Sequence, residues 1–359
     1  MLRLAHLATF QFHSAQREFL FGSGWCQLGV LSESNVNSIG SNLKGESMEV
    51  LTGAERLQYE RERIEPYVGA IGWRSIFNFL WFFGGWCATA ALVMTDVLSI
   101  WIGIPLAVFF LQAGYMPMHE AVHNTLSAGR PKLKWIDRAV GSVTGWLLCE
   151  SFVTHRITHL KHHTHANEDT DPDLLNSKGT PIDLVVRALL GFCLYPLGPI
   201  FGLVPPLQRL LPSTVRARLA EMGRLRGPEA MAASRPVVVS HLVVLIAGSV
   251  LGYAQLVWLL WYVPAWIGRF WLSLVFGWLP HHPHGETGRY RDTRIFTFVG
   301  STFLIRGHDH HLLHHLFPVV PHYHLRSLWR DMSSHLVAQG ARIEGLAAKV
   351  SAAPSDDSP

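Results

Sequence analysis

The stretch that decides the fold covers residues 76–123 and reads IFNFLWFFGGWCATAALVMTDVLSIWIGIPLAVFFLQAGYMPMHEAVH. Residues 76–115 are mostly apolar, and Asp96 near their middle is the single charged residue among them. About 20 residues cross a bilayer as a helix. The stretch therefore predicts two membrane-spanning helices joined by a tight turn, with His119 and His123 directly beyond the second span.

The composition of the whole chain agrees with a membrane protein. Of its 359 residues, 49% are hydrophobic and 16% are charged, whereas a soluble domain carries about 25% charged residues. The net charge of +4 is small, and no basic stripe interleaved with aromatic residues indicates nucleic-acid binding. The four cysteines form no CxxC pair, so neither a disulfide framework nor a thiolate metal site is predicted.

A second apolar block covers residues 236–279, and GYAQ at residues 252–255 is its expected turn. It predicts a second helical hairpin and hence about four spans. Lys and Arg are absent from residues 76–129 but frequent just before and after each hairpin. By the positive-inside rule, both hairpins begin and end in the cytoplasm. We expect an integral protein of a bacterial inner membrane, with every histidine cluster on the cytoplasmic face.

The rest of the chain divides by composition. Residues 1–47 contain neither a convincing span nor a signal peptide, and we expect a disordered N-terminal extension there. Residues 48–75 predict a charged cytoplasmic surface helix, residues 76–335 the membrane domain, and residues 336–359 a C-terminal tail. Two further apolar stretches, residues 139–153 and 184–211, are too short or too rich in proline to span easily, so we expect interfacial or re-entrant segments.

Histidine is the residue that points to chemistry, because fifteen of the 21 histidines fall in four short clusters. The first cluster is His119-Glu-Ala-Val-His123, whose two imidazoles share one helix face and can grip one metal ion. Taken alone, this is also the HExxH pattern of zinc proteases, in which Glu120 would be the general base.

Two further clusters repeat one spacing, HxxHH. They read His159-Leu-Lys-His162-His163 and His311-Leu-Leu-His314-His315. Together with the first cluster they supply eight imidazoles, and the fourth cluster at residues 281–284 offers a ninth. This exceeds what one tetrahedral zinc ion uses, so two metal ions are predicted. Imidazole suits Zn, Cu, Fe and Ni alike, so the ligand type does not select the metal.

Three segments resemble the histidine boxes of the membrane fatty acid desaturase superfamily, in the order and with the separations of that family. They are HEAVHNTLS at 119–127, HLKHHTHANEDTDPD at 159–173 and HHLLHHLFP at 310–318. WLPHHPHGETGRYRD at 278–292 and HHLFPVVPHYH at 314–324 are more similar to the bacterial and cyanobacterial carotenoid-hydroxylase branch. The resemblance covers residues 74–329.

The resemblance implies an all-α membrane protein, in which two transmembrane helical hairpins support a cytoplasmic helical cap with a di-iron centre. It implies a ninth ligand about thirty residues before the third box; His282 is the candidate, with His281 behind it, and His155 and His310 are possible substitutes elsewhere. The implied iron ligands are His119, His123, His159, His162, His163, His282, His311, His314 and His315.

The reaction implied by the resemblance uses O2 and two electrons to remove hydrogen from a lipid-like substrate, which gives a double bond or an alcohol. The HPGG motif of a fused cytochrome b5 is absent from the sequence, so a separate ferredoxin or cytochrome with its reductase is the expected electron donor. Fatty acyl desaturation is the first expectation, and carotenoid ring hydroxylation is a near rival.

Two alternatives come from other classes of protein. One is a membrane zinc metalloprotease that uses HExxH, which leaves the duplicated HxxHH unexplained. The other is a histidine-rich metal transporter, which would carry its histidines near the bilayer midplane within the spans. Here the clusters follow the spans.

Several single residues give weaker signals. Glu120 is either a group that orients a ligand imidazole or an exposed helix residue. Asp171 and Asp173 are expected to bond histidines of the second box or nearby backbone. Arg269 lies in the last span, where a charge is costly, so it is either functional or snorkels to the interface. Isolated histidines such as His241 are expected to be structural.

The N-terminal segment gives a first prediction. Removing residues 1–47 should leave product formation unchanged, because that segment holds neither a predicted span nor a histidine box. The measurement is product per milligram of membrane-inserted protein for the full and truncated chains. A truncated chain that inserts normally but forms no product would contradict it.

Overall fold

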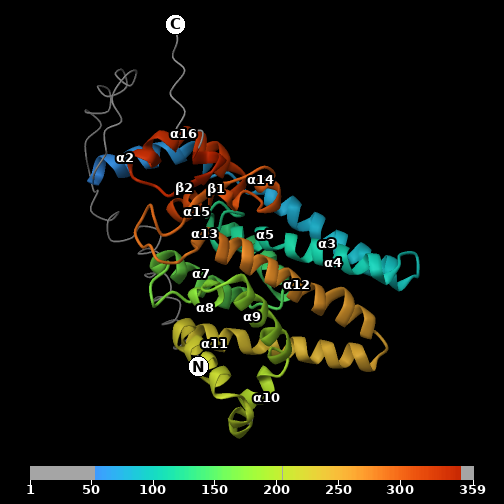
Figure 1. The fold of residues 1–359 in the computed structure, drawn as a ribbon. Helices are drawn as coiled ribbons and strands as arrows, with labels where there is room; N and C mark the ends of the chain where they lie inside the picture. The colour runs from blue at the N-terminus through green and yellow to red at the C-terminus, as the bar shows by residue number, and fades with distance from the viewer. Residues whose placement is uncertain (1–52, 204, 349–359) are drawn as a thin grey trace. The chain divides into compact units, whose positions relative to one another are not determined.

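The computed structural model describes residues 53–203 and 205–348, and these residues are almost entirely helical (Figure 1). The expected N-terminal extension and the last residues of the expected tail lie outside the described residues. In chain order, the longer helices are α2 (Gly53–Ile64), α3 (Trp73–Met94), α4 (Ile100–Ala113), α5 (Tyr115–Val122), α6 (Lys134–Leu147), α7 (Phe152–His165), α9 (Pro181–Leu194), α11 (Ser213–Val250), α12 (Val263–Leu272) and α16 (Leu325–Ala338).

Shorter elements connect these helices. They are η2 (Glu65–Tyr67), η3 (Pro131–Leu133), α8 (Leu174–Ser177), α10 (Gly198–Leu203), η4 (Pro205–Leu210), η5 (Gln255–Tyr262), η6 (Ser273–Trp278), α13 (Leu279–His281), β1 (Ile295–Thr297), α14 (Ser301–Leu304), η7 (His308–His310), α15 (His311–Leu316), η8 (His322–His324) and β2 (Ile343–Gly345).

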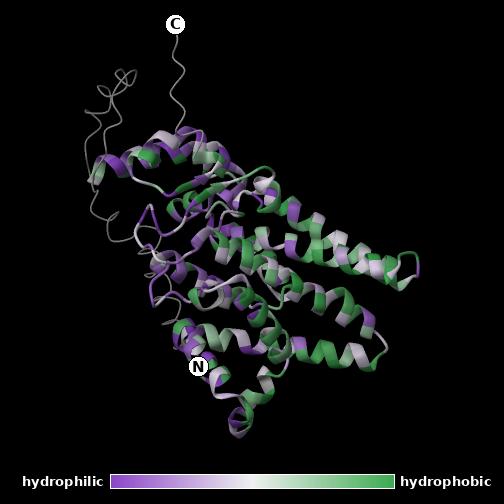
Figure 2. Ribbon diagram, viewed as in Figure 1, coloured by the Kyte–Doolittle hydropathy of each residue, from purple (hydrophilic) through white to green (hydrophobic). Residues whose placement is uncertain are grey.

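Four helical stretches are long and apolar enough to cross a membrane, as the sequence predicted: Trp73–Met94, Ile100–Val122, Ser213–Val250 and Gln255–His281. Within this part of the chain, consecutive spans pair as two hairpins that extend in the same direction (Figure 1). The hairpin ends are rich in hydrophobic residues, whereas hydrophilic residues gather at the opposite ends of the helices (Figure 2).

The two hairpin turns need unusual backbone conformations. Asp96, the one charged residue of the first apolar block, lies in the first turn with a φ of +59°. Gly252 lies in the second turn with a φ of +88°, at the expected GYAQ sequence. Glycine adopts positive φ without steric cost, and Asp tolerates it better than most residues do.

The third and fourth spans depart from regular α-helix. Gly227, with a φ of +83°, and the following Pro228 divide α11 into a charged first part and an apolar second part. The fourth span contains two π-helical segments, η5 and η6. π-helical segments are rare in proteins, and those that occur often lie at functional sites. Here η6 ends directly before α13.

The two hairpins and the interfacial helices share an apolar core. Trp146 of α6 stacks on Trp261 of η5 with ring centroids 4.6 Å apart. The indole N–H of Trp261 donates to the Leu147 carbonyl oxygen at 2.9 Å, and that of Trp86 in α3 donates to the Leu260 carbonyl oxygen at 2.8 Å. These bonds hold α3 and α6 against the fourth span.

The two shorter apolar stretches do not form candidate spans in the described residues. The first becomes α6 and the turn after it, and the second becomes α9, α10 and η4. α9 exposes large apolar side chains, among them Ile182 and Leu189. This agrees with the expected position at the membrane interface.

The cap is built from the two ends of the described chain. α2 lies within the expected surface helix and packs on α16 (Figure 1). β1 and β2 form a parallel pair in which Phe296 is opposite Glu344. Residues 336–348, assigned from the sequence to the tail, belong to this folded cap, because Leu336 and Ala347 are buried in its core.

A buried carboxylate fastens α2 to the rest of the cap. Glu60 pairs with Arg289 at 2.6 Å, accepts a hydrogen bond from the Tyr290 hydroxyl, and lies 3.4 Å from Nε2 of His335. Burial raises the pKa of Glu60, but its hydrogen bonds and Arg289 outweigh burial, and the pKa lies below its usual range.

We therefore expect Glu60→Ala to destabilise the cap by about 1–3 kcal/mol, because it leaves the Tyr290 hydroxyl and Arg289 without their partner. The measurement is the thermal unfolding temperature of the purified protein in detergent. Glu62→Ala is the matched control, because Glu62 is an exposed carboxylate on the same helix that bonds Gln58. Equal unfolding temperatures for the two variants would contradict the prediction.

Candidate metal centre

The histidine boxes lie where the spans meet the cap. α5 continues the second span and carries His119, and His123 ends that helix. α13 ends the fourth span with His281, and α15 carries the third box. α7 carries the second box and is capped at its N-terminus by Ser151, whose hydroxyl accepts a hydrogen bond from the Thr154 N–H.

α7 is held against α11 by two hydrogen bonds. The Thr154 hydroxyl donates to the Ala230 carbonyl oxygen at 2.8 Å, and the Lys161 ammonium donates to the Leu225 carbonyl oxygen at 2.9 Å. α7 also packs against α5 and α6. The second box is therefore fixed by helices from both hairpins and from the interface.

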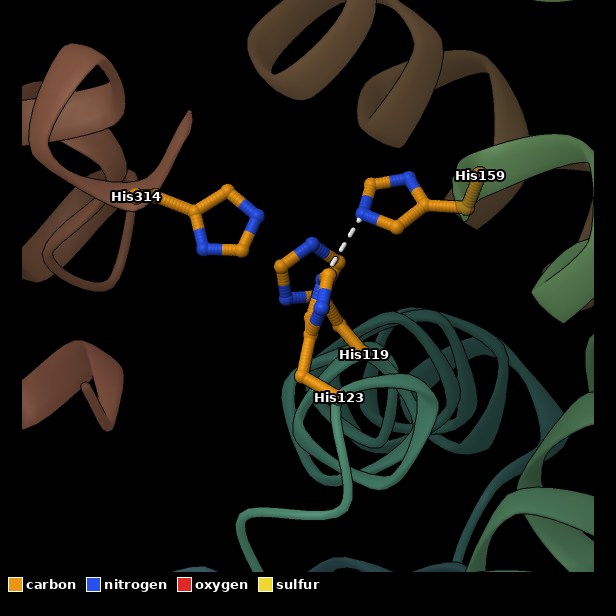
Figure 3. A group of neighbouring side chains, drawn as sticks. All are labelled: His119, His123, His159 and His314. Carbon is orange, nitrogen blue, oxygen red and sulfur yellow. Dashed lines mark hydrogen bonds between the residues drawn. The ribbon is translucent and has the colours of Figure 1, made fainter. Parts of the chain in front are cut away.

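Eight imidazoles form two groups of four, each with ligand nitrogens within 4.8 Å of one another. The first group joins α5, α7 and α15, and Figure 3 shows its rings turned toward one another; its members are His119, His123, His159 and His314. The second group joins α7, α13 and α15; its members are His162, His281, His311 and His315.

The nitrogen contacts within this centre are too many for hydrogen bonds. Nε2 of His159 lies 3.1 Å from Nε2 of His123 and 3.0 Å from Nε2 of His163, which in turn lies 3.0 Å from Nε2 of His314. Each ring nitrogen offers only one hydrogen-bonding position in the ring plane. Nitrogens that share an ion at about 2.1 Å lie roughly 3 Å apart, so these residues fit a metal ion.

His163 lies between the two groups. Besides its contact with His314, its ring stacks on that of His315 with centroids 4.3 Å apart. His315 belongs to the second group, so the two groups form one continuous centre. The structure thus brings together His163 and seven of the eight other imidazoles that the sequence indicated as ligands.

Burial keeps most of these imidazoles neutral. It lowers the pKa of His123 to about 3 and holds the pKa values of His159, His163, His311, His314 and His315 well below their usual range. Neighbouring histidines and, for His123, Arg156 lower the values further. A neutral imidazole is the form that binds metal ions.

His162 differs because a carboxylate faces it. Its Nδ1 lies 2.9 Å from Asp171, which also accepts hydrogen bonds from the backbone N–H groups of Asn167 and Asp173. Although burial lowers the pKa of His162, Asp171 raises it to about 9. A carboxylate on one ring nitrogen orients the other toward a metal ion and makes it more basic.

The structure places His281, and not His282, in the second group. Nε2 of His281 lies 3.2 Å from Nε2 of His311. At His282 the chain leaves the helix, with a ψ of 136°, and its ring packs on Trp278 at 4.4 Å. The point at which the fourth span ends therefore decides which of the two adjacent histidines faces the centre.

The other marked residues have different surroundings. Glu120 accepts hydrogen bonds from the Thr125 hydroxyl at 2.8 Å and from the His322 backbone N–H at 2.9 Å, so it ties the first box to the segment after the third. His310 bonds Asp309 and lies outside both groups. His241 is structural, as expected, and bonds the Tyr195 hydroxyl and the Trp146 carbonyl oxygen.

Two neighbours of the centre were missed in the sequence. His308 is fully buried, and its Nδ1 lies 2.9 Å from Nδ1 of His311. His308 is three residues before His311, and this spacing alone could have indicated that the two rings lie close together. Asp292 lies 3.7 Å from Nδ1 of His315, and burial raises its pKa to about 6. Asp292 is the last residue of the segment at 278–292, but no regular spacing relates it to the histidines of the third box.

A cavity of about 140 Å³ reaches both histidine groups. His119 and His159 of the first group line it, together with three members of the second group, His162, His281 and His311. Its other walls come from α5, α7, α8, α11, α12 and η6, including Tyr115, Leu272 and Phe276. A substrate atom in this cavity therefore lies against the metal centre.

Comparison with known proteins agrees with this arrangement. A model of the fatty acid desaturase family matches residues 95–345, which is well over half of the chain. The chain belongs to the fatty acid desaturase family. It is also similar to a beta-carotene ketolase from Paracoccus sp., with 24% identity over 266 residues that cover 67% of this chain and 92% of the ketolase.

The desaturase family membership makes this protein an integral membrane oxidoreductase with a two-metal histidine centre. It implies a lipid-like substrate and an electron donor. The metalloprotease alternative loses its support, because Glu120 is buried and already bonded by Thr125 and His322. The transporter alternative loses its support too, because the groups lie at the ends of the spans.

The position of His281 gives a prediction about the ninth ligand. We expect His281→Ala to lose bound metal, whereas His282→Ala retains it, because His281 is the one histidine of this pair that belongs to the second group. The measurement is metal per chain in purified protein at matched yield. Full metal content in His281→Ala together with loss in His282→Ala would restore the assignment made from the sequence.

Proposed function

We propose that this enzyme uses two iron ions and O2 to oxidise a ring carbon of a carotenoid. The observation that carries the proposal is the similarity to a beta-carotene ketolase, which extends over 92% of that protein. The segments at residues 278–292 and 314–324, which resemble the carotenoid-hydroxylase branch, support it. Fatty acyl desaturation, the first expectation from the sequence, is the second candidate, and the name of the matching family favours it.

The proposed iron ligands are nine imidazoles. His119, His123, His159 and His314 would hold one ion, His162, His281, His311 and His315 the other, and His163 lies between them. Imidazole alone does not select iron, and the family resemblance is the reason for choosing it. When bound, the irons supply the activation of O2, which is chemistry that the protein itself cannot perform.

The protein's share of the reaction is to fix the ligands and place the substrate. Asp171 orients His162, and Glu120 holds the chain after the third box against the first box. Tyr115, Leu272 and Phe276, which lie in the second and fourth candidate spans, give the cavity an apolar wall that suits an apolar ring. Correct placement of one C–H bond against the centre decides which carbon is oxidised.

The overall reaction balances with an external electron donor. One C–H group, one O2, two electrons and two protons give one C–OH group and one water. A second such oxidation of the same carbon gives a geminal diol, which loses water to form a ketone. We propose that the electrons come from a separate ferredoxin or cytochrome that docks on the cytoplasmic face, where the positive-inside rule places the centre.

Expression in a bacterial host that makes β-carotene should yield hydroxyl or ketone derivatives. Each hydroxylation adds one oxygen atom to the mass, and each ketone adds one oxygen atom and removes two hydrogen atoms. The measurement is chromatography with mass detection of the carotenoids, alongside a profile of the host's fatty acids. His314→Ala should abolish the product, because His314 contacts three other imidazoles of the centre.

The matched control for His314→Ala is His324→Ala, a histidine of the same segment that lies outside both groups and packs on Tyr67 and Tyr323. It should retain product formation. New double bonds in the fatty acids with unchanged carotenoids would overturn the carotenoid proposal and favour the second candidate. Purified protein with one zinc and no iron would overturn both.

A further inference from the structure

The cavity beside the metal centre has a polar end that a hydrocarbon substrate would leave unused. Four charged side chains line it: Glu150, Asp173, Arg226 and Arg269. His155 lines it too. Ligand pockets are mostly apolar, with a small number of placed polar groups that fix the orientation of the ligand. Only the groups that lack hydrogen-bond or ion-pair partners within the protein are free to bind a ligand.

Glu150 and Arg269 satisfy each other. The Arg269 guanidinium pairs with the Glu150 carboxylate at 2.8 Å and donates to the carbonyl oxygens of Leu148 and Cys149 at 3.0 and 3.2 Å. These two carbonyl groups follow the end of α6, where helix carbonyls lack partners and a cation is favourable. Arg269 is therefore neither free for a substrate nor snorkelling to the interface.

Asp173 and His155 have no such hydrogen-bonded partners. Among the described residues, no group donates a hydrogen bond to the half-buried Asp173 carboxylate, whose own backbone N–H donates to Asp171. Arg226 attracts this carboxylate electrostatically. The Nε2 atom of His155 is buried and has no hydrogen-bond partner in the same part of the chain. Its ring is fixed by stacking on His159, with centroids 5.5 Å apart.

The two groups offer complementary hydrogen-bonding atoms. An aspartate oxygen accepts a hydrogen bond, and an imidazole nitrogen either donates or accepts one. A hydroxyl group can donate to Asp173 and accept from His155 at the same time, so a ligand that carries a hydroxyl gains affinity from both.

We propose that Asp173 and His155 bind a hydroxyl group that the substrate carries close to the carbon to be oxidised. The inference rests on the proposed function and names its substrate: a carotenoid ring that already bears oxygen is preferred over the unsubstituted hydrocarbon ring. The same cavity is lined by His119, His159, His162, His281 and His311. The oxygen and the reacting carbon are therefore only a few bonds apart.

This proximity separates ring oxidation from desaturation in the middle of an acyl chain. In a mid-chain substrate, the reacting methylene groups are many bonds from the nearest oxygen, and the polar end of the cavity would face only methylene groups. An oxygenated ring places its oxygen and its neighbouring carbons within one small cavity. The unpaired groups thus favour the ring substrate.

The test measures binding and turnover with two carotenoids, β-carotene and 3-hydroxy-β-carotene. The full chain with its metal, reconstituted in lipid nanodiscs, should bind the hydroxylated ring about tenfold more tightly, as followed by quenching of tryptophan fluorescence. Asp173→Ala should remove this preference by weakening binding of the hydroxylated ring about tenfold. Binding of β-carotene should change less than twofold.

His155→Phe is the second variant, because it keeps an aromatic ring against His159 and removes the nitrogen. It should lose the same preference. Asp169→Asn is the matched control, an exposed carboxylate of the same loop that does not line this cavity, and it should behave as the parent protein does. Bound metal is measured for every variant. If Asp173→Ala loses metal, the affinities of His155→Phe for the two carotenoids test the inference instead.

Equal affinity of the parent protein for the two carotenoids would overturn the inference. An equal loss of affinity for both carotenoids in the metal-loaded variants would overturn it too. Conversion of β-carotene in the same preparations would then leave the proposed function standing. Neither binding nor conversion of either carotenoid would overturn the proposed function, and the inference with it.

Discussion

Crowding of neutral imidazoles is the constraint on which the rest of the structure depends. Nine histidine rings converge in a buried volume, and their nitrogens lie about 3 Å apart in positions that hydrogen bonds cannot all satisfy. Without a cation, such an arrangement leaves buried lone pairs facing one another. Ions held by the two groups would give these nitrogens a shared partner, so we expect metal binding and correct folding of this region to be coupled.

That coupling explains why the surrounding helices are tied together so firmly. The imidazoles of the two groups come from α5, α7, α13 and α15, which are far apart in the chain. Glu120 links the first box to the third, Asp171 fixes the second, and the Arg269–Glu150 pair closes the end of α6. Glu120 and Asp171 are buried and hydrogen-bonded, and Glu150 is half-buried and paired with Arg269, so these polar contacts make the local structure specific.

Much of this could be predicted from the sequence, because the signals were local. The spans follow from long uncharged apolar runs, and the ligands follow from the i, i+3 and i+4 spacing that places imidazoles on one helix face. The division into two groups was not accessible, since it depends on which helices meet. The choice between His281 and His282 depended on the last turn of a helix, and helix ends are poorly defined by sequence.

The sequence allowed two interpretations of Arg269, and the structure agrees with neither of them. A charge within an apolar span predicted either a functional group or a side chain that snorkels. In the structure it is paired with Glu150 and bonded to two carbonyl groups beyond α6, so its cost in hydrocarbon is offset by contacts that no local pattern shows. With both charges of this pair satisfied, the cavity still presents Asp173, Arg226 and the unpartnered Nε2 atom of His155 to a polar atom of the proposed substrate.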